Sequence, residues 1–272
     1  MTITPPNPSV RVDVDGAICR ITFARPESLN AINLDVVAAL DGVTSAIRVD
    51  DTIRCVILSG AGDHFMAGGD IKHFQDRIAA VPDKAALRDE FETLLDDVHK
   101  VITNMRAMPQ PIIASVRGAA AGAGVSVMLA CDLVLASDNA FFTLAYSHLG
   151  ASPDGGSTFQ LPRTAGMKRA MEIALLGDRF DAETAERYGL INRVIADADL
   201  DAETEKLATR LAAGPARAYA HTKALLNASL GNTLQQQLDA ESDSFADCVT
   251  GPDFAEGVAA FNEKRKPAFK GQ

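Results

Sequence analysis

The stretch from Pro111 to Ser157 constrains the fold of this 272-residue chain more than any other part of it. It opens with an apolar run at 111–116, rich in β-branched residues, which predicts a buried strand. Residues 119–124 follow, and none of them has a side chain larger than a methyl group. Residues 125–131 then predict an apolar helix. A strand, a turn of small residues and a helix in this order present free backbone N–H groups at the helix N-terminus, where a ligand can approach closely.

Polar side chains follow this helix, after a second predicted strand at 133–136. Tyr146, His148 and Asp154 precede a Gly-Gly-Ser sequence that ends at Ser157. A turn rich in N–H donors, followed by a few polar groups, suits an active site that stabilises an anion. A tightly packed turn without any chemistry explains this stretch equally well.

A second turn of small residues lies between Gly60 and Gly69, after a predicted strand at 55–58 and before a helix that begins near Ile71. Taken alone, such a connection is explained by the tight backbone conformations that glycine permits. Two such turns, each between a β-branched strand and a helix, predict that one N–H group from each converges on a single oxygen atom.

Composition excludes several classes of protein. The formal net charge of −10 argues against a nucleic-acid partner, which requires a basic surface. Four cysteines lie far apart in the sequence, which suits a reducing cytoplasm and predicts neither a disulfide framework nor a metal site. The first nine residues lack the pattern of a signal peptide, and no apolar run approaches the ~20 residues that span a membrane.

The remaining pattern predicts an α/β protein with a helical C-terminal part. Residues 10–14 and 17–23 predict a hairpin, and 33–48 a helix with one apolar face. Strands and helices alternate to about residue 195. Only helices follow, with breaks at Gly214-Pro215 and Gly251-Pro252.

Several motifs together resemble those of one known family in their order and spacing. They are Arg25-Pro26-x-x-Leu29-Asn30-Ala31, Ala67-Gly68-Gly69-Asp70-Ile71, the run from Pro111 to Gly118, Ala130-Cys131-Asp132-Leu133, Leu176-Gly177-Asp178, Ala185-x-x-Tyr188-Gly189-Leu190-Ile191 and Phe261-Asn262-Glu263-Lys264-Arg265. The chain thus resembles the crotonase superfamily, the enoyl-CoA hydratase/isomerase family, over essentially its whole length after the first ten residues. Its Pro-Asp-Gly-Gly motif at 153–156 resembles the isomerase branches.

The resemblance implies a crotonase-like spiral of ββα units at 1–198, which holds the CoA and acyl site. It implies a helical oligomerisation region at 199–272, in a homotrimer or a hexamer made of two trimers. The expected substrate is an acyl-CoA thioester, so coenzyme A enters as part of the substrate and no permanently bound cofactor or metal is expected. The expected location is the cytoplasm, with no nucleic-acid or membrane partner.

The resemblance also assigns site residues. It places the donors of an oxyanion hole at the backbone N–H groups of Gly69 and Ala123, where the family usually has glycine at the second position. It places coenzyme A near five residues: Glu27, Ser28, Leu29, Ala67 and Ile71. Phe261 and Lys264 are expected to reach the CoA of a neighbouring subunit, and an amphipathic terminal helix with a solvated basic end is the alternative.

The catalytic positions depart from the hydratase pattern. Hydratases of this family hold a water molecule between two glutamates, and the matching positions here are Ser126 and Tyr146. Neither side chain serves as a carboxylate base, which argues against ordinary two-glutamate hydration. Ser126 is a candidate for holding a water or for packing, and Tyr146 for donating a hydrogen bond or for lining the pocket.

Asp154 offers a different route, because isomerisation needs a single base that moves a proton between two carbons. The sequence therefore favours an enoyl-CoA isomerase that uses Asp154, although Pro-Asp-Gly is also an ordinary turn. A hydratase or another crotonase reaction that uses Asp154, and a non-catalytic acyl-CoA-binding homologue, remain as alternatives. The dehalogenases of the superfamily pair their aspartate with a tryptophan, and this chain has none.

The histidines and two further aspartates complete the candidates. His148 is a candidate to assist Asp154, while His64 and His73 flank the first turn without an assigned role. Asp70 and Asp132 occur in the family motifs and are predicted to accept hydrogen bonds from nearby backbone donors. The residues from Phe74 to Met105 are expected to supply part of the acyl pocket and part of the core.

Overall fold

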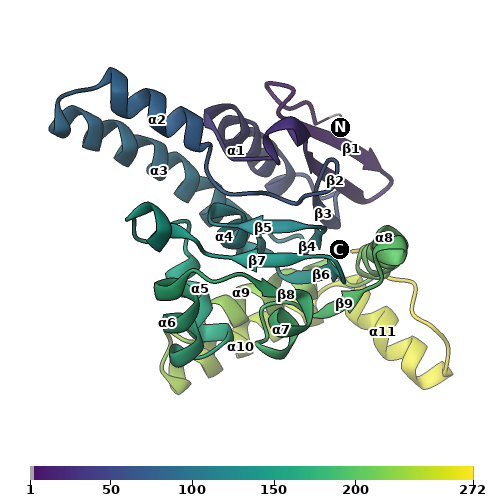
Figure 1. Ribbon diagram of the computed structural model, residues 1–272. Helices are drawn as coiled ribbons and strands as arrows, with labels where there is room; N and C mark the ends of the chain where they lie inside the picture. The colour runs from purple at the N-terminus through teal and green to yellow at the C-terminus, as the bar shows by residue number, and fades with distance from the viewer. Residues whose placement is uncertain (1–2, 272) are drawn as a thin grey trace.

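A six-stranded sheet forms the centre of the computed structural model, which describes residues 3–271 (Figure 1). Its strands lie in the order β1-β2-β3-β4-β6-β9. They comprise β1 (Val10–Asp15), β2 (Ile18–Phe23), β3 (Cys55–Gly60), β4 (Ile112–Val116), β6 (Leu133–Ser137) and β9 (Arg193–Ile195). β1 and β2 form the predicted antiparallel hairpin, and every other pair in this sheet is parallel.

A smaller sheet contains β5 (Ala119–Ala121), β7 (Phe141–Thr143) and β8 (Phe180–Asp181). The sequence predicted a turn over 119–124, and this was wrong for its first half, because β5 pairs in parallel with β7. Methyl side chains at Ala119 and Ala120 let this strand pack in the core, where both residues are buried. Only the second half of the segment turns into the next helix, α4 (Ala123–Ala130).

The two faces of the large sheet pack against different layers. Successive strand residues point to opposite faces, so Val56 and Leu58 join the main core while Cys55 and Ile57 form a separate cluster. This second cluster includes Ala208 of α8 (Leu200–Ala212), which therefore covers one face of the sheet. On the other side, all eight residues of α4 are buried, which explains why this helix is apolar around its whole circumference.

The predicted helix at 33–48 is confirmed as α1 (Leu34–Arg48). Its first turn is capped by the Asn33 side chain, which accepts a hydrogen bond from the Val36 N–H at 3.0 Å. α1 packs against α3 (Lys84–Ala107), the second arm of a helical hairpin whose first arm is α2 (Ile71–Ala80). This hairpin projects from the body at the upper left of Figure 1, and an ion pair between Arg77 and Glu90 joins its arms.

The predicted succession of helices after residue 195 is also confirmed. It consists of η3 (Asp197–Asp199), α8, α9 (Ala216–Ser229), α10 (Leu234–Val249) and α11 (Pro252–Glu263). The remaining elements are η1 (Pro26–Ser28), η2 (Tyr146–Leu149), α5 (Ser157–Thr164), α6 (Met167–Leu176) and α7 (Ala182–Arg187). Among residues 3–271, no helix combines the length and the apolar character needed to cross a bilayer.

Candidate active site

The two turns of small residues lie against each other. The Met66 N–H donates to the Ala119 carbonyl and the Ala121 N–H donates to the Met66 carbonyl, both at 2.9 Å. A methyl group on Gly122 would lie 3.6 Å from the Cα of Gly68. A methyl group on Gly124 would overlap the Met66 carbonyl, so this position requires glycine. Glycine at these positions therefore allows the two turns to pack in contact with each other.

The N–H groups of Gly69 and Ala123 have no hydrogen-bond acceptor within residues 3–271, whereas those of Asp70 and Gly122 are paired. The Ile32 N–H donates to the Gly68 carbonyl at 2.7 Å, and the Asp70 N–H donates to the Ile32 carbonyl at 3.0 Å. In such a bridge the N–H of the central residue, Gly69, faces away from the pairing strand. Ala123 is the first residue of α4, where the helix offers its N–H no acceptor.

The loop at 25–30 is fixed to the first turn by Asn30. This side chain is fully buried; its amide group donates to the carbonyls of Ala61 at 3.0 Å and His64 at 2.7 Å. Its oxygen accepts the Arg25 N–H at 3.0 Å. Leu29 adopts a left-handed conformation with φ of 52°, and its carbonyl accepts the Ala67 N–H at 3.0 Å.

This arrangement brings the expected CoA-binding residues together along one loop and one turn. They are Glu27, Ser28, Leu29, Ala67 and Ile71, the last being the first residue of α2 and half exposed. An ion pair at 3.1 Å between Arg25 and Asp70 also joins the loop to the start of α2.

Asp154 forms hydrogen bonds with both Tyr146 and Ser126. The Tyr146 Oη donates to the Asp154 Oδ1 at 2.6 Å. The Ser126 Oγ donates to the backbone carbonyl of Asp154 at 2.9 Å, and the Ser157 Oγ donates to the same carbonyl at 3.0 Å. Three candidates that lie up to 28 residues apart in the sequence thus form one cluster.

Burial and the negative carboxylate govern the chemistry of the phenol. Desolvation first, and then the charge of Asp154 and the hydrogen bond to it, raise the pKa of Tyr146 well above its ordinary value. The phenol consequently remains a hydrogen-bond donor through the neutral range. Close packing maintains the cluster, because a methyl group on Gly155 would lie 2.8 Å from the Cβ of Ser126.

The three candidate histidines, His64, His73 and His148, contact the backbone or a neighbouring aromatic ring. The His148 Nε2 lies 3.0 Å from the Leu176 carbonyl, so the expected partnership with Asp154 is not formed. The His64 Nδ1 accepts the Ala119 N–H at 3.1 Å and thereby supports the junction of the two turns. His73 lies on α2, where its ring is 6.4 Å from that of Phe74.

Asp70 and Asp132 accept backbone hydrogen bonds, as predicted. Asp70 caps α2 by accepting the His73 N–H at 3.2 Å. Burial raises the pKa of Asp70, but the hydrogen bonds from the His73 N–H and from Arg25 outweigh it, and the pKa lies below its ordinary value. Asp132 accepts the Ile112 N–H at 2.8 Å.

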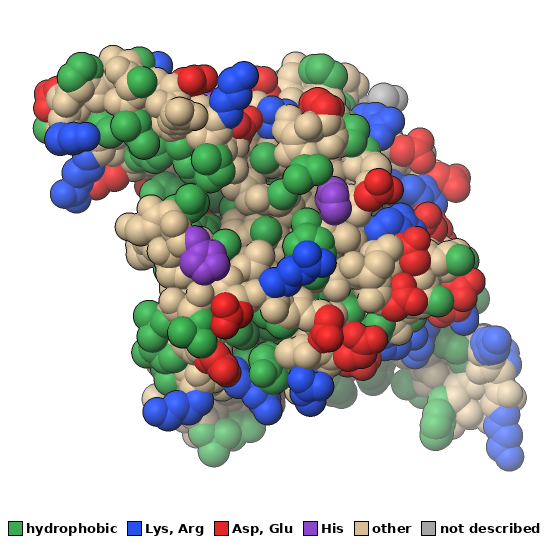
Figure 2. All heavy atoms as spheres, in the orientation of Figure 1, with side chains coloured by type: hydrophobic (Ala, Val, Ile, Leu, Met, Phe, Trp, Pro, Cys, Tyr) green, Lys and Arg blue, Asp and Glu red, His purple; other side chains and the backbone are tan. Residues whose placement is uncertain are grey.

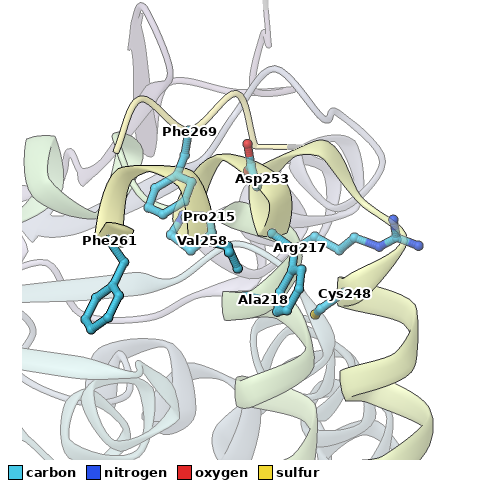
Figure 3. A pocket seen from close by; sticks show the side chains of 10 residues that line it. Pro215, Arg217, Ala218, Cys248, Asp253, Val258, Phe261 and Phe269 are labelled. Atoms are coloured by element: carbon cyan, nitrogen blue, oxygen red, sulfur yellow. The ribbon is translucent and has the colours of Figure 1, made fainter. Parts of the chain in front are cut away.

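Phe261 and Lys264 lie at the end of α11, which projects at the lower right of Figure 1, far from α2 and α4. Phe261 is 84% exposed and lines a hollow of about 390 Å³ between α9, α10 and α11 (Figure 3). Asp253 also lines this hollow. Its carboxylate accepts hydrogen bonds from the N–H groups of Lys270 and Gly271, so this side chain anchors the C-terminal segment to α11.

Figure 2 shows Lys and Arg side chains interspersed with Asp and Glu over one face, with no continuous basic patch on it. Within residues 3–271, no three His, Cys, Asp or Glu side chains are grouped so that they would hold a metal ion.

Two contributors were missed as site residues in the sequence. Ser157 stands three residues after Asp154, a spacing at which a hydroxyl commonly bonds a preceding carbonyl, so this contact had a local signal. Arg25 had no such signal, because its partner Asp70 lies 45 residues away.

Comparisons with known proteins identify the family. The family model described as enoyl-CoA hydratase/isomerase matches residues 13–272. The chain is 38% identical over 260 residues to the 1,2-epoxyphenylacetyl-CoA isomerase of Escherichia coli K12, with 95% of this chain and 97% of that protein covered. It is 37% identical over 265 residues to a protein of Rhodobacter capsulatus named "Probable enoyl-CoA hydratase", with 97% and 98% covered.

A solved structure gives the same result for the fold. The crystal structure of an enoyl-CoA hydratase from Polaromonas sp. JS666 matches with a TM-score of 0.89 and 35% identity, covering 96% of this chain and 99% of that one. The predicted crotonase-like α/β fold with a helical C-terminal region is thereby confirmed. This chain belongs to the enoyl-CoA hydratase/isomerase family of the crotonase superfamily.

Proposed function

We propose that this protein is an enoyl-CoA isomerase in which Asp154 shifts a double bond by proton transfer. One observation carries the proposal: the two positions that hold glutamates in hydratases hold hydroxyl groups here, and both of these bond to Asp154. The cluster therefore contains one carboxylate, which is the number that an isomerisation requires.

The reaction begins with a 3-enoyl thioester. Asp154 removes a proton from C2, and the electron pair of that C–H bond delocalises onto the thioester oxygen as a dienolate. The carboxylic acid so formed returns the proton to C4, which leaves the double bond between C2 and C3. The conversion is redox-neutral and consumes no water.

The N–H groups of Gly69 and Ala123 stabilise the enolate oxygen in this proposal. Their location on two turns in contact, and their lack of an acceptor within residues 3–271, support this role. Fixed donors of this kind contribute roughly 3–4 kcal/mol each to the stabilisation of the transition state.

Coenzyme A lies along the loop and turn in this proposal, against Glu27, Ser28, Leu29, Ala67 and Ile71. The hairpin of α2 and α3 supplies part of the acyl pocket. Phe74 presents its ring to Gly69, where a methyl group would lie 2.8 Å from it, and it packs 5.3 Å from the ring of Phe91. Figure 2 shows hydrophobic side chains gathered on the underside of this hairpin.

The two parts of the chain have different roles in this proposal. Residues 1–198 form the core that carries the site, and 199–272 form the region through which a trimer or a hexamer assembles. Exposed apolar residues on the last helices, among them Leu234 and Phe245, support an assembly role. Phe261 and Lys264 then reach the CoA of a neighbouring subunit.

Four free cysteines suit a cytoplasmic location.

The second candidate is hydration of a 2-enoyl thioester by a water molecule that Asp154 activates. The Rhodobacter capsulatus relative, whose printed name is that of a hydratase, favours this candidate. The Escherichia coli relative, equally similar over its length, is named as an isomerase of a CoA thioester and so supports isomerisation as the reaction type, while its printed substrate is an epoxide.

Parallel assays of wild type and Asp154→Asn with 3-enoyl-CoA and 2-enoyl-CoA distinguish the two. We expect wild type to convert the 3-enoyl substrate to its 2-enoyl isomer, with kcat reduced about 10²–10⁴-fold in Asp154→Asn. Hydration of the 2-enoyl substrate that persists in this variant would refute the role of Asp154. Binding of acyl-CoA without either reaction would instead indicate a non-catalytic homologue.

A further inference from the structure

We propose that Tyr146 is the positioning residue of this site: it holds one oxygen of Asp154, Oδ1, so that the other, Oδ2, faces the substrate. The inference rests on the proposed function, and it adds a role for a residue that replaces a glutamate of the hydratases.

The contact itself has the geometry of a strong hydrogen bond. The distance of 2.6 Å between the Tyr146 Oη and the Asp154 Oδ1 lies in the range of a hydroxyl bonded to a charged carboxylate. Within residues 3–271, the structure gives Oδ2 no hydrogen-bond donor, so the two oxygens of this carboxylate are not equivalent.

Backbone hydrogen bonds fix Tyr146 at the start of η2. The Tyr146 N–H donates to the Leu144 carbonyl at 2.7 Å, and the Tyr146 carbonyl accepts the Ala151 N–H at 3.1 Å. Its ring packs beside Gly122, where a methyl group would lie 3.9 Å from Cε2. The same residue thus touches both the turn that precedes α4 and the carboxylate, and it can set the distance between them.

The backbone of Asp154 is fixed independently by two hydroxyls. Ser126 of α4 and Ser157 of α5 both donate to its carbonyl, at 2.9 and 3.0 Å. The remaining freedom of Asp154 lies in its side-chain rotation, and this is the freedom that the Tyr146 hydrogen bond removes. Proton transfer depends on such alignment, since a misplacement of about 1 Å costs up to about a hundredfold in rate.

Removal of this one hydroxyl predicts a specific kinetic pattern. Phenylalanine keeps the ring in place, so binding of an acyl-CoA should be retained while proton transfer slows because the carboxylate is less well aligned. If the residue only filled space, phenylalanine would change neither quantity. The separation of kcat from binding therefore distinguishes positioning from packing.

The test compares Tyr146→Phe with Tyr188→Phe, a matched removal of a hydroxyl that has no hydrogen bond within residues 3–271. For Tyr146→Phe we expect kcat for 3-enoyl isomerisation to fall about ten- to hundredfold. Binding of a non-reactive acyl-CoA thioether should stay within about twofold, and Tyr188→Phe should match wild type.

Three other outcomes would contradict the inference. A Tyr146→Phe enzyme with wild-type kcat would overturn the inference and leave the proposed function intact, provided that Asp154→Asn is inactive. Equal loss of kcat and thioether binding would overturn the inference and assign Tyr146 a structural role only. Full activity of Asp154→Asn would overturn both the inference and the proposed function.

Discussion

The Lys223 ammonium lies 2.7 Å from the carboxylate of Asp132 and thereby joins α9 to the short connection between α4 and β6. Both groups are buried from solvent to a large degree, at 8% and 19% side-chain exposure. Burial lowers the pKa of Lys223 and raises that of Asp132, since desolvation disfavours each charged form. Lys223 also donates to the carbonyls of Met105 and Gln110, so it links the C-terminal helices to the core.

Lys223→Met should therefore destabilise the fold by about 3–5 kcal/mol, because it leaves the Asp132 charge buried without a partner. The double variant with Asp132→Asn should recover part of that loss, since the uncompensated charge is gone. Urea unfolding of the single and double variants measures both values. Strictly additive losses would show that the two side chains are not coupled.

Substitution of Gly124 tests the close contact between the two turns. Gly124→Ala should lower the free energy of unfolding by about 1–3 kcal/mol, because the new methyl group meets the Met66 carbonyl. Activity should fall as well, since relief of the overlap separates the turns.

The matched control for this substitution is Gly42→Ala, also within a helix. Here the nearest atom to the new methyl group is the Cδ of Pro6 at an ordinary 3.7 Å. This variant should gain about 0.5–1 kcal/mol from the higher helix propensity of alanine. Thermal or urea unfolding measures both, and equal changes of one sign in the two variants would contradict the proposed contact.

Asn30→Ala should lower the free energy of unfolding by about 1–3 kcal/mol, because it leaves two partly buried carbonyls and the Arg25 N–H without the Asn30 side chain. The same change should weaken binding of coenzyme A, since Asn30 fixes the loop that contains Leu29. Calorimetric titration measures the binding, and Asn232→Ala, at a helix connection in the C-terminal region, serves as control. Unchanged affinity in Asn30→Ala would separate the loop from the CoA site.

The contact between Glu256 of α11 and the segment at 265–268 should weaken in acid. Hydrogen bonds from Arg265 first, and from the Ala268 N–H, lower the pKa of Glu256 to about 2 from 4.5. A carboxylate whose pKa is lowered in the folded state stabilises it above the unfolded value, and this contribution is lost as the pH falls through the folded value. The contact should therefore persist at pH 5 and weaken as the pH falls from about 4.5 towards 2.

The NMR shift of the Ala268 amide reports this titration. In wild type it should change with a midpoint near 2, and in Glu256→Gln the transition should be absent. A wild-type midpoint near 4.5 would mean that the contacts of Glu256 with Arg265 and Ala268 do not form in solution.

The sequence alone determined the elements and the family. Period-two and helical apolar patterns located the hairpin of β1 and β2, helix α1 and the helical C-terminal part, because burial on one face leaves a local signature. It also identified Gly69, Ala123 and Asp154 as candidate site residues, because the order and spacing of the family motifs can be recognised in the sequence itself. The strand β5 was missed, because its small residues carry no strand propensity and its pairing with β7 depends on a partner about 20 residues away.

Only the tertiary structure decided which side chains meet. His148 and Tyr146 both precede Asp154 closely, yet the backbone of η2 directs the phenol to the carboxylate and the imidazole to the Leu176 carbonyl. Arg25 and Asp70 form an ion pair across 45 residues, and Lys223 reaches Asp132 across 91. Such contacts depend on long-range packing and on the direction of each side chain, neither of which local sequence patterns record.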